Sequence, residues 1–310
     1  MVEIGDPGMS KRVFLSHIAN LTSPICCIVQ KVWFENRGSQ ILVKDTLSME
    51  AIKEGLRTVC FGQDIRYFPS TESTNLIAKK IAEQGGKEGT LVIADYQTRG
   101  KGRLARTWWS PPGANLLFSL IFRPSSEVTH SFRLTLLCSL AVAQAIRQET
   151  GLEALIKWPN DVYIKGKKVS GILSELGFKD GTLEYVVVGI GMNVNCDPST
   201  HPELLDIATS LRIELKRNVS RLTLLTGILK MIEGYYELMK RGEFGALRES
   251  WELLSLVKGK RVRIVSLECS KEGIAESIDD EGFLIIRNSS GERERIVSGD
   301  VSLTFVEEVV

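Results

Sequence analysis

A change of hydrophobic period near residue 258 is the feature that most constrains the fold. Before it, amphipathic helical stretches alternate with buried extended segments, whereas after it short strands such as 261–265 alternate and turns recur at 279–282 and 288–291. The first pattern is typical of an α/β or α+β domain, and about 50 residues of short strands predict a small barrel. We therefore expect two folded domains, 49–257 and 258–310.

The first 48 residues differ from both domains. They contain short apolar bursts without a sustained period, apart from one stretch, Gly8–Leu21, that has Ser10 at an N-cap position and apolar residues on one helical face. One helix does not make a domain. We therefore expect residues 1–48 to form an N-terminal extension.

Charge and cysteine content limit the partners and the compartment. The chain has 39 Lys plus Arg against 38 Asp plus Glu, so it lacks the basic excess typical of nucleic-acid-binding domains, and any anion site must be local. The 6 Cys form no CxxC pair and only 3 His are present, which argues against a zinc site. Each apolar stretch falls well short of the roughly 20 residues that span a bilayer. We expect a soluble, cytoplasmic protein with reduced thiols.

Hydrophobic spacing places the main elements of the first domain. Residues 134–146 carry apolar side chains at i, i+3, i+4 and i+7, which predicts a helix that faces the core. Ser73 is expected to cap a helix that ends at Gly85-Gly86, and Ser220 to cap a longer one. Further elements are expected as strands at 90–94, 116–122, 154–158, 162–164, 169–176 and 183–195, and as a helix at 244–254.

The segment from Gln97 to Trp108 carries the strongest chemical signal. Four cations lie within eight residues of it, at Arg99, Lys101, Arg103 and Arg106, and glycines separate the first three. Because a glycine inside a helix or strand costs about 0.5–1 kcal/mol relative to alanine, this segment predicts a loop. Such a loop offers unshielded backbone N–H groups beside fixed positive charge, which suits a phosphate or a carboxylate.

Three later segments have a similar character. Lys157-Trp158-Pro159-Asn160-Asp161 sets polar side chains at a break between strands, because proline cannot donate to the ladder. Lys168 stands at the head of an apolar strand, where it could reach an anion above the sheet or simply be solvated. The run Gly189-Ile190-Gly191-Met192-Asn193-Val194-Asn195 combines glycines that permit close approach with amide donors and acceptors.

Together with Ser73-Thr74-Asn75 and Gly113-Ala114-Asn115-Leu116, these segments resemble the motifs of biotin protein ligases in their order and approximate spacing. The resemblance covers about residues 65–305. It implies an α+β fold, a mixed sheet with helices on one side, similar to class II aminoacyl-tRNA synthetases, followed by an SH3-like barrel. It also implies a biotin–[acetyl-CoA-carboxylase] ligase that uses ATP and Mg²⁺. Such an enzyme forms biotinyl-5'-AMP and transfers biotin to a lysine of a biotin carboxyl carrier protein.

The resemblance also implies roles for individual residues. Lys168 and Arg103 would be the catalytic residues, and Asp161 is the candidate for holding Mg²⁺. The biotin-binding residues would be Ser73, Thr74, Asn75, Gln97, Lys101, Gly102, Arg103 and Lys168. The ATP-binding residues would be Arg103, Arg106, Trp108, Asn115, Lys157, Asn160 and Asn193.

Two positions depart from the family loop, which usually reads Gly-Arg-Gly-Arg-x-Gly-Arg. Lys101 replaces its first arginine and loses the planar two-pronged donor, which predicts a weaker hold on the biotin carboxylate. Ala105 replaces its last glycine, a change that matters only if the backbone there needs a positive φ.

Two alternative functions are kept. A lipoate or octanoate ligase would have a similar catalytic domain and the same motif lysine, although Ser73-Thr74-Asn75 and Gln97 offer the polar partners that a ureido ring needs. A bifunctional ligase and biotin-operon repressor would use an N-terminal helix-turn-helix, which Gly8–Leu21 resembles in part. Only seven residues precede that stretch, so we interpret it as a degenerate remnant and do not expect DNA binding. We expect no membrane partner, and a homodimer is left open.

Overall fold

The computed structural model describes residues 47–124, 131–265 and 270–303. The helix predicted from Ser10 and most of the N-terminal extension lie outside these residues. Among the described residues, no helix is long and apolar enough to cross a membrane.

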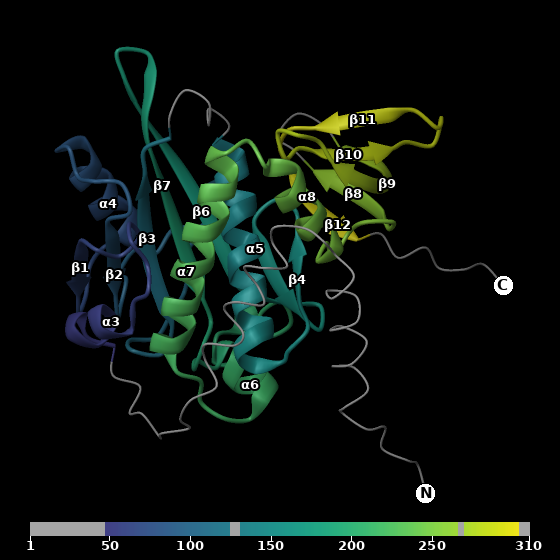
Figure 1. Ribbon diagram of the computed structural model, residues 1–310. Helices are drawn as coiled ribbons and strands as arrows, with labels where there is room; N and C mark the ends of the chain where they lie inside the picture. Colours follow the sequence, from purple (N-terminus) through teal and green to yellow (C-terminus); the bar gives the residue numbers. More distant parts are fainter. Residues whose placement is uncertain (1–46, 125–130, 266–269, 304–310) are drawn as a thin grey trace, which may run out of the picture. The chain divides into compact units, whose positions relative to one another are not determined.

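A seven-stranded mixed sheet forms the centre of the first domain (Figure 1). Its strand order is β1-β2-β3-β7-β6-β5-β4, with β1 and β2 parallel and the other neighbours antiparallel. The mixed sheet with helices that the sequence predicts is therefore confirmed. The strands are β1 (Ile65–Phe68), β2 (Leu91–Ala94), β3 (Leu116–Phe122), β4 (Ala154–Lys157), β5 (Asp161–Ile164), β6 (Lys167–Lys179) and β7 (Thr182–Met192).

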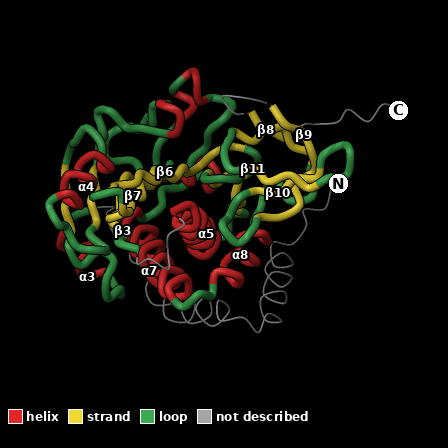
Figure 2. The backbone as a smooth tube through the Cα atoms, turned by 90° about the horizontal axis from the view of Figure 1, so that it is seen from above, coloured by secondary structure: helices red, strands yellow, loops and turns green. Residues whose placement is uncertain are grey.

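Helices pack on both faces of this sheet, so the expectation of helices on one side only is wrong. The physical reason is that successive side chains of a strand point to opposite faces, and both faces of the central strand are apolar. Strand β3 is buried along its whole length. Ile121 packs with Ala78 of α4 on one face, whereas Phe122 contacts Tyr236 of α7 on the other. In Figure 2, α5 and α7 lie together on one side of β3, β7 and β6. The helices are α3 (Met49–Gly55), α4 (Thr74–Glu83), α5 (Ser131–Thr150), α6 (Leu211–Leu215), α7 (Arg221–Lys240) and α8 (Phe244–Leu253).

The two predicted helix caps have different outcomes. Ser220 accepts a hydrogen bond from the backbone N–H of Thr223, as expected of an N-cap. Ser73 occupies the N-cap position of α4, as expected, but its side chain makes no capping hydrogen bond. Ser73 lines a cavity, which is described below.

The C-terminal part of the chain forms a five-stranded antiparallel sheet in the order β11-β10-β9-β8-β12. Its strands are β8 (Arg261–Val265), β9 (Ser270–Ile278), β10 (Leu284–Arg287), β11 (Arg293–Ile296) and β12 (Asp300–Leu303). This sheet lies where the sequence predicts the small barrel.

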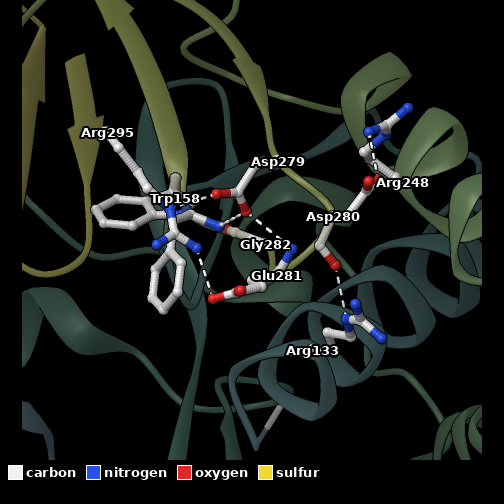
Figure 3. A network of polar contacts seen from close by, with 9 residues as sticks. Arg133, Trp158, Arg248, Asp279, Asp280, Glu281, Gly282 and Arg295 are labelled. Carbon is white, nitrogen blue, oxygen red and sulfur yellow. Dashed lines mark hydrogen bonds and ion pairs between the residues drawn. The ribbon is translucent and has the colours of Figure 1, made fainter. Parts of the chain in front are cut away.

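The turn between β9 and β10 packs against the first domain (Figure 3). Trp158, which is 1% exposed, donates a hydrogen bond from Nε1 to the Gly282 carbonyl at 3.1 Å. Asp280 accepts hydrogen bonds from Arg133 and Arg248, at its carbonyl and its carboxylate respectively. Gly282 has a φ of +91°, and a Cβ there would lie 2.4 Å from Leu136 of α5. The turn between β9 and β10 thus holds the segment that contains Trp158 in place.

Candidate active site

The predicted motif segments surround one cavity of about 410 Å³. These segments are far apart in the sequence, and the sheet brings them together because β3, β7, β6 and β5 are neighbours. Of the sequence-predicted site residues, all except Asn115 line this cavity. They are Ser73, Thr74, Asn75, Gln97, Lys101, Gly102, Arg103, Arg106, Trp108, Lys157, Asn160, Asp161, Lys168 and Asn193.

The glycine and arginine segment is a tight loop, as predicted. The Gly102 N–H donates to Arg106 O at 2.7 Å, and the Trp108 N–H donates to Gly100 O at 2.9 Å. A Cβ on Gly100 would lie 2.5 Å from Trp108 O, so only glycine fits there. Leu104 and Ala105 have φ values of 53° and 58°. Ala105 therefore occupies the left-handed conformation that the family's glycine adopts more easily.

Two glycines on adjacent strands form a floor for Trp108. Gly171 of β6 pairs with Gly191 of β7, and a Cβ on either would lie within 3.2 Å of the indole ring. The ammonium group of Lys168 lies 5.6 Å from the centroid of the same ring. Gly191 thus permits close approach, as expected of the run that begins at Gly189, and the group that approaches Gly191 is Trp108.

A β-bulge turns Lys168 toward the cavity. The register between β5 and β6 shifts there, because Val162 pairs with Ser170 whereas Tyr163 pairs with Lys168. Bulges commonly change the direction of a side chain next to an active site. Lys168 Nζ lies 2.8 Å from Asp161 Oδ1, so the strand-end lysine and the carboxylate of the preceding strand form an ion pair.

Two further cations of the cavity also contact other side chains of the protein, Arg103 through Asn160 and Arg106 through Asp300. Arg103 Nη1 donates to Asn160 Oδ1 at 2.8 Å, and Asn160 Nδ2 in turn donates to Ile172 O at 2.8 Å. Arg106 pairs with Asp300 of β12. Polar groups of the protein therefore occupy positions beside these guanidinium groups that anionic substrate groups could take.

Burial and mutual repulsion alter the titration of the groups near these cations. Burial is the largest cause that lowers the pKa of Lys157, Asp161 opposes it, and Lys168 lowers it further. Burial and the Asp161 charge raise the pKa of Tyr163 to about 12. The site thus holds several cations in a partly desolvated cleft, an arrangement that strengthens their attraction for an anion.

Neutral polar groups also line the cavity. Ser73, Thr74 and Asn75 begin helix α4 and are buried. Gln97 accepts a hydrogen bond at Oε1 from the Thr74 N–H at 2.7 Å. These residues offer amide and hydroxyl groups without net charge.

Asn115 is fully buried behind the cavity wall. It accepts a hydrogen bond at Oδ1 from the Val194 N–H at 3.0 Å, and its Nδ2 donates to Ser110 Oγ at 3.0 Å and Asn193 Oδ1 at 3.4 Å. Its amide therefore holds Asn193 and the neighbouring strand end in place. A direct contact between Asn115 and ATP stays a prediction.

Sequence reasoning missed several residues at the site. Tyr163, Ile207 and Asp300 line the cavity. Asp300 belongs to β12 and lies 194 residues after its partner Arg106 in the sequence. No local pattern marks Asp300, because only the packing of the second sheet brings it there. Ser119 and Glu175 contact Asn75 from behind. A single polar residue within the apolar strand Leu116–Phe122 is the signal that could have identified Ser119.

The donor set gives one candidate for a metal. Among the residues that the structure describes, no group of three or more His, Cys, Asp or Glu side chains could hold a metal ion. Mg²⁺ commonly binds through one or two carboxylates together with substrate phosphates. Asp161 in the cavity fits that requirement for a metal that arrives with a polyphosphate.

Comparison with known families agrees with these features. The profile of the Biotin/lipoate A/B protein ligase family matches residues 67–193, and that of the Biotin protein ligase C terminal domain matches residues 258–304. The Bifunctional ligase/repressor BirA of Bacillus subtilis (strain 168) is 38% identical over 269 residues, which are 86% of this chain and 82% of that protein. The Biotin--[acetyl-CoA-carboxylase] ligase of Paracoccus denitrificans is 30% identical over 240 residues, which cover 74% of this chain and 97% of that protein.

A solved structure has a similar fold. The biotin protein ligase from Aquifex aeolicus, in complex with biotin and ATP, superposes with a TM-score of 0.69 at 31% sequence identity. The similarity covers 78% of this chain and 99% of that one.

Proposed function

Since the chain belongs to the biotin protein ligase family and is a ligase, we propose that it joins biotin to a lysine of a carrier protein at the expense of ATP. In the first step a carboxylate oxygen of biotin attacks the α-phosphorus of ATP and pyrophosphate leaves, which forms biotinyl-5'-AMP. In the second step the lysine amine attacks the acyl carbon, AMP leaves, and an amide forms. The acceptor is a biotin carboxyl carrier protein or domain.

One observation carries this proposal. One cavity is lined by five cations from three separate segments, and neutral polar side chains line it as well. The cations are Lys101, Arg103, Arg106, Lys157 and Lys168. The first step brings a carboxylate to a triphosphate, so it needs positioning and positive charge more than an acid–base pair. The cations suit the two anions, and the neutral polar side chains suit an uncharged ureido ring.

Lys168 and Arg103 are the proposed catalytic residues. Lys168 lines the cavity and pairs with Asp161, and a substrate anion would displace or share that carboxylate. Arg103 would exchange its bond to Asn160 for a bond to the substrate. Arg106, Lys157, Asn160 and Asn193 are proposed to contact the nucleotide.

Mg²⁺ would supply positive charge to the phosphates when bound, and Asp161 is the residue proposed to hold it.

The indole Nε1 of Trp108 is buried and has no hydrogen-bond partner within the described part of the chain. A buried donor without a partner costs about 1–3 kcal/mol, so an acceptor on the ligand would recover that cost.

Mass spectrometry of a biotin carboxyl carrier domain incubated with the protein, biotin and Mg-ATP tests the proposal directly. We expect a mass gain of one biotinyl group on the carrier, and none when ATP is omitted. A carrier of unchanged mass would overturn it.

A lipoate or octanoate ligase is the nearest alternative, because one matching family includes lipoate ligases. The buried polar groups Ser73, Thr74 and Asn75 favour biotin over an apolar acyl chain. Pyrophosphate exchange measured with each acid separates the two functions, and exchange with lipoate but not biotin would reverse the assignment.

A repressor function is the second candidate, because the Bacillus subtilis relative carries that name as well. The stretch that would bind DNA lies among residues 1–46, outside the described residues. Salt-sensitive binding to DNA upstream of the protein's own gene, strengthened by biotin and ATP, would support it.

We further propose that the chain has domains at 49–257 and 258–310 and a cytoplasmic location. A measurement of mass in solution will decide whether it forms a homodimer.

A further inference from the structure

The two turns of the second sheet that flank β10 have the same construction. The turn between β9 and β10 begins at Asp279, whose Oδ1 accepts hydrogen bonds at 2.9 Å from the N–H groups two and four residues later. The turn between β10 and β11 begins at Asn288, whose Oδ1 accepts the same two bonds at 3.0 Å. The third residue after each is a glycine with a positive φ, Gly282 or Gly291. Local sequence thus builds two closely similar turns.

The surroundings of the two turns differ. A Cβ on Gly282 would lie 2.4 Å from Leu136 and 3.1 Å from Phe132, both of α5, whereas a Cβ on Gly291 would have no atom within 4 Å. Asp280 of the first turn also accepts hydrogen bonds from arginines of α5 and α8, at 2.6 Å and 2.7 Å (Figure 3). Because the two turns are built alike, the seating of the first one on these helices calls for a separate explanation.

Trp158 connects the first turn to the cavity. The residue lines the cavity and is 1% exposed, and its indole Nε1 donates to the carbonyl of the buried Gly282 at 3.1 Å (Figure 3). Trp158 begins the loop that joins β4 to β5, directly after Lys157 and two residues before Asn160. Asn160 in turn accepts a hydrogen bond from Arg103 at 2.8 Å. A displacement of Trp158 would thus move two residues that are proposed to contact ATP.

A group of aromatic rings fixes the same contact from the side. The Phe283 ring stacks on Phe132 of α5, with centroids 5.0 Å apart and planes at 28°. Phe132 lies 5.8 Å from the Trp158 ring, and the Arg295 guanidinium lies 4.5 Å from the centroid of Phe283. Tilted and offset contacts at such separations are favourable for aromatic rings. The turn therefore reaches Trp158 through a ring cluster as well as through a hydrogen bond.

We propose that the turn at 279–283 positions the part of the site assigned to ATP, with Trp158 and Asp279 as its positioning residues. Asp279 closes the turn and so places the Gly282 carbonyl. That carbonyl holds the Trp158 ring, and the ring holds the loop that carries Asn160. The inference rests on the proposed function, because its readout is the use of ATP. Distance from the reacting atoms is no obstacle, since a misplacement of about 1 Å can cost about 10²-fold in rate.

Trp158→Phe keeps an aromatic ring in the cavity wall and removes the N–H donor. Trp251→Phe is the matched control. Trp251 of α8 is 2% exposed, donates its indole N–H to Ser139 Oγ at 3.1 Å, and is not among the residues that line the cavity. Each variant leaves a buried acceptor without its donor, so the melting temperatures of the two should fall by similar amounts. Only Trp158→Phe should also impair the use of ATP.

The full-length protein is assayed by biotin-dependent pyrophosphate exchange with ATP varied, and biotin binding is titrated without ATP. We expect kcat/KM for ATP to fall at least about tenfold in Trp158→Phe, because small displacements in a site have large kinetic effects. The affinity for biotin should not change, since the residues proposed to bind its ureido ring, Ser73, Thr74 and Asn75, begin α4 and not the displaced loop. Trp251→Phe should keep the wild-type kcat/KM for ATP.

A second pair of variants acts from the turns themselves. Asp279→Ala removes the two bonds that close the first turn, and Asn288→Ala removes the equivalent two from the second turn. Asp279→Ala should lower kcat/KM for ATP as Trp158→Phe does, although Asp279 is not among the residues that line the cavity. The double variant should lose little more than either single variant, because both changes remove the same contact. Asn288→Ala should leave the kinetics unchanged.

Equal kinetics in Trp158→Phe and Trp251→Phe, at similar losses of melting temperature, would overturn the inference. So would an equal fall of biotin affinity and of kcat/KM for ATP, which a general disturbance of the fold produces. Should Trp158→Phe fail to fold, the comparison of Asp279→Ala with Asn288→Ala decides the question. A wild-type protein without biotin-dependent exchange contradicts the proposed function itself, whereas exchange that survives in all the single variants refutes only the role of the turn.

Discussion

Removing the Lys168 ammonium group should separate catalysis from folding. In Lys168→Ala the charge that the bulge turns toward the cavity is lost, together with its 2.8 Å contact to Asp161. Removing one well-placed electrostatic group commonly costs about 2.7–4 kcal/mol in the transition state, or about 10²–10³-fold in rate. We therefore expect adenylate formation to fall by that factor.

The effect on stability should be smaller. The side chains of Lys168 and Asp161 are 30% and 20% exposed, so water screens the pair and solvates the carboxylate that remains. Ion pairs with this degree of exposure contribute on the order of 1 kcal/mol. The melting temperature should therefore drop by only a few degrees, while the loss of activity is near complete.

Biotin-dependent pyrophosphate exchange and thermal unfolding, measured on the same preparations, check this prediction. Lys165→Ala is the matched control, since Lys165 lies in the turn before Lys168 and loses an ion pair of 3.0 Å with Glu214. The control should keep its exchange rate. If Lys168→Ala retained exchange close to the wild-type rate, the assignment of Lys168 would be refuted.

Four further changes probe other parts of the site. Gly191→Ala places a Cβ 2.6 Å from the Trp108 ring, so adenylate formation should fall and tryptophan fluorescence should change, and overpacking of this kind costs about 1–3 kcal/mol; an unchanged rate would contradict the packing argument. Gly282→Ala should lower the melting temperature clearly more than Gly291→Ala, because both have positive φ but only the first meets side chains, those of α5; equal losses would count against it. Ala105→Gly relieves a φ of 58°, which costs about 1–2 kcal/mol in residues other than glycine. Because glycine also adds freedom to the unfolded chain, the free energy of unfolding should rise by at most about 1 kcal/mol in a denaturant titration, and a clear fall would contradict the argument. Finally, burial lowers the pKa of Lys157 from the ordinary value of 10.5, so Lys157 loses its charge at a lower pH than an ordinary lysine does. Arginine keeps its charge at that pH, so in Lys157→Arg the alkaline fall of kcat/KM for ATP should shift to higher pH. A pH profile that does not shift would exclude Lys157 from nucleotide binding.

Periodicity predicted most of the elements around the site because they are long or wholly apolar. The strand at 116–122 has the predicted bounds, and the helix predicted at 134–146 is the centre of Ser131–Thr150. The short elements α3 and β1 were missed, since four to seven residues carry too little pattern. Ser73 is at the expected N-cap position of α4, and the lack of a capping bond from its side chain could not be predicted from the sequence.

Local sequence by itself determined which chemical groups this protein can bring to a reaction, because glycine-spaced cations and strand-end lysines need no partner to be recognised. Tertiary structure alone decided how those groups are paired and oriented. Asp300 reaches Arg106 only through the packing of the second sheet, and Gly191 admits Trp108 only because two strands are in register. Likewise Glu175 accepts a hydrogen bond from Asn75, 100 residues away in the sequence, through a contact that no sequence period encodes. The physical reason is that side-chain type is a local property, whereas hydrogen-bond direction and steric fit depend on atoms brought together by the fold.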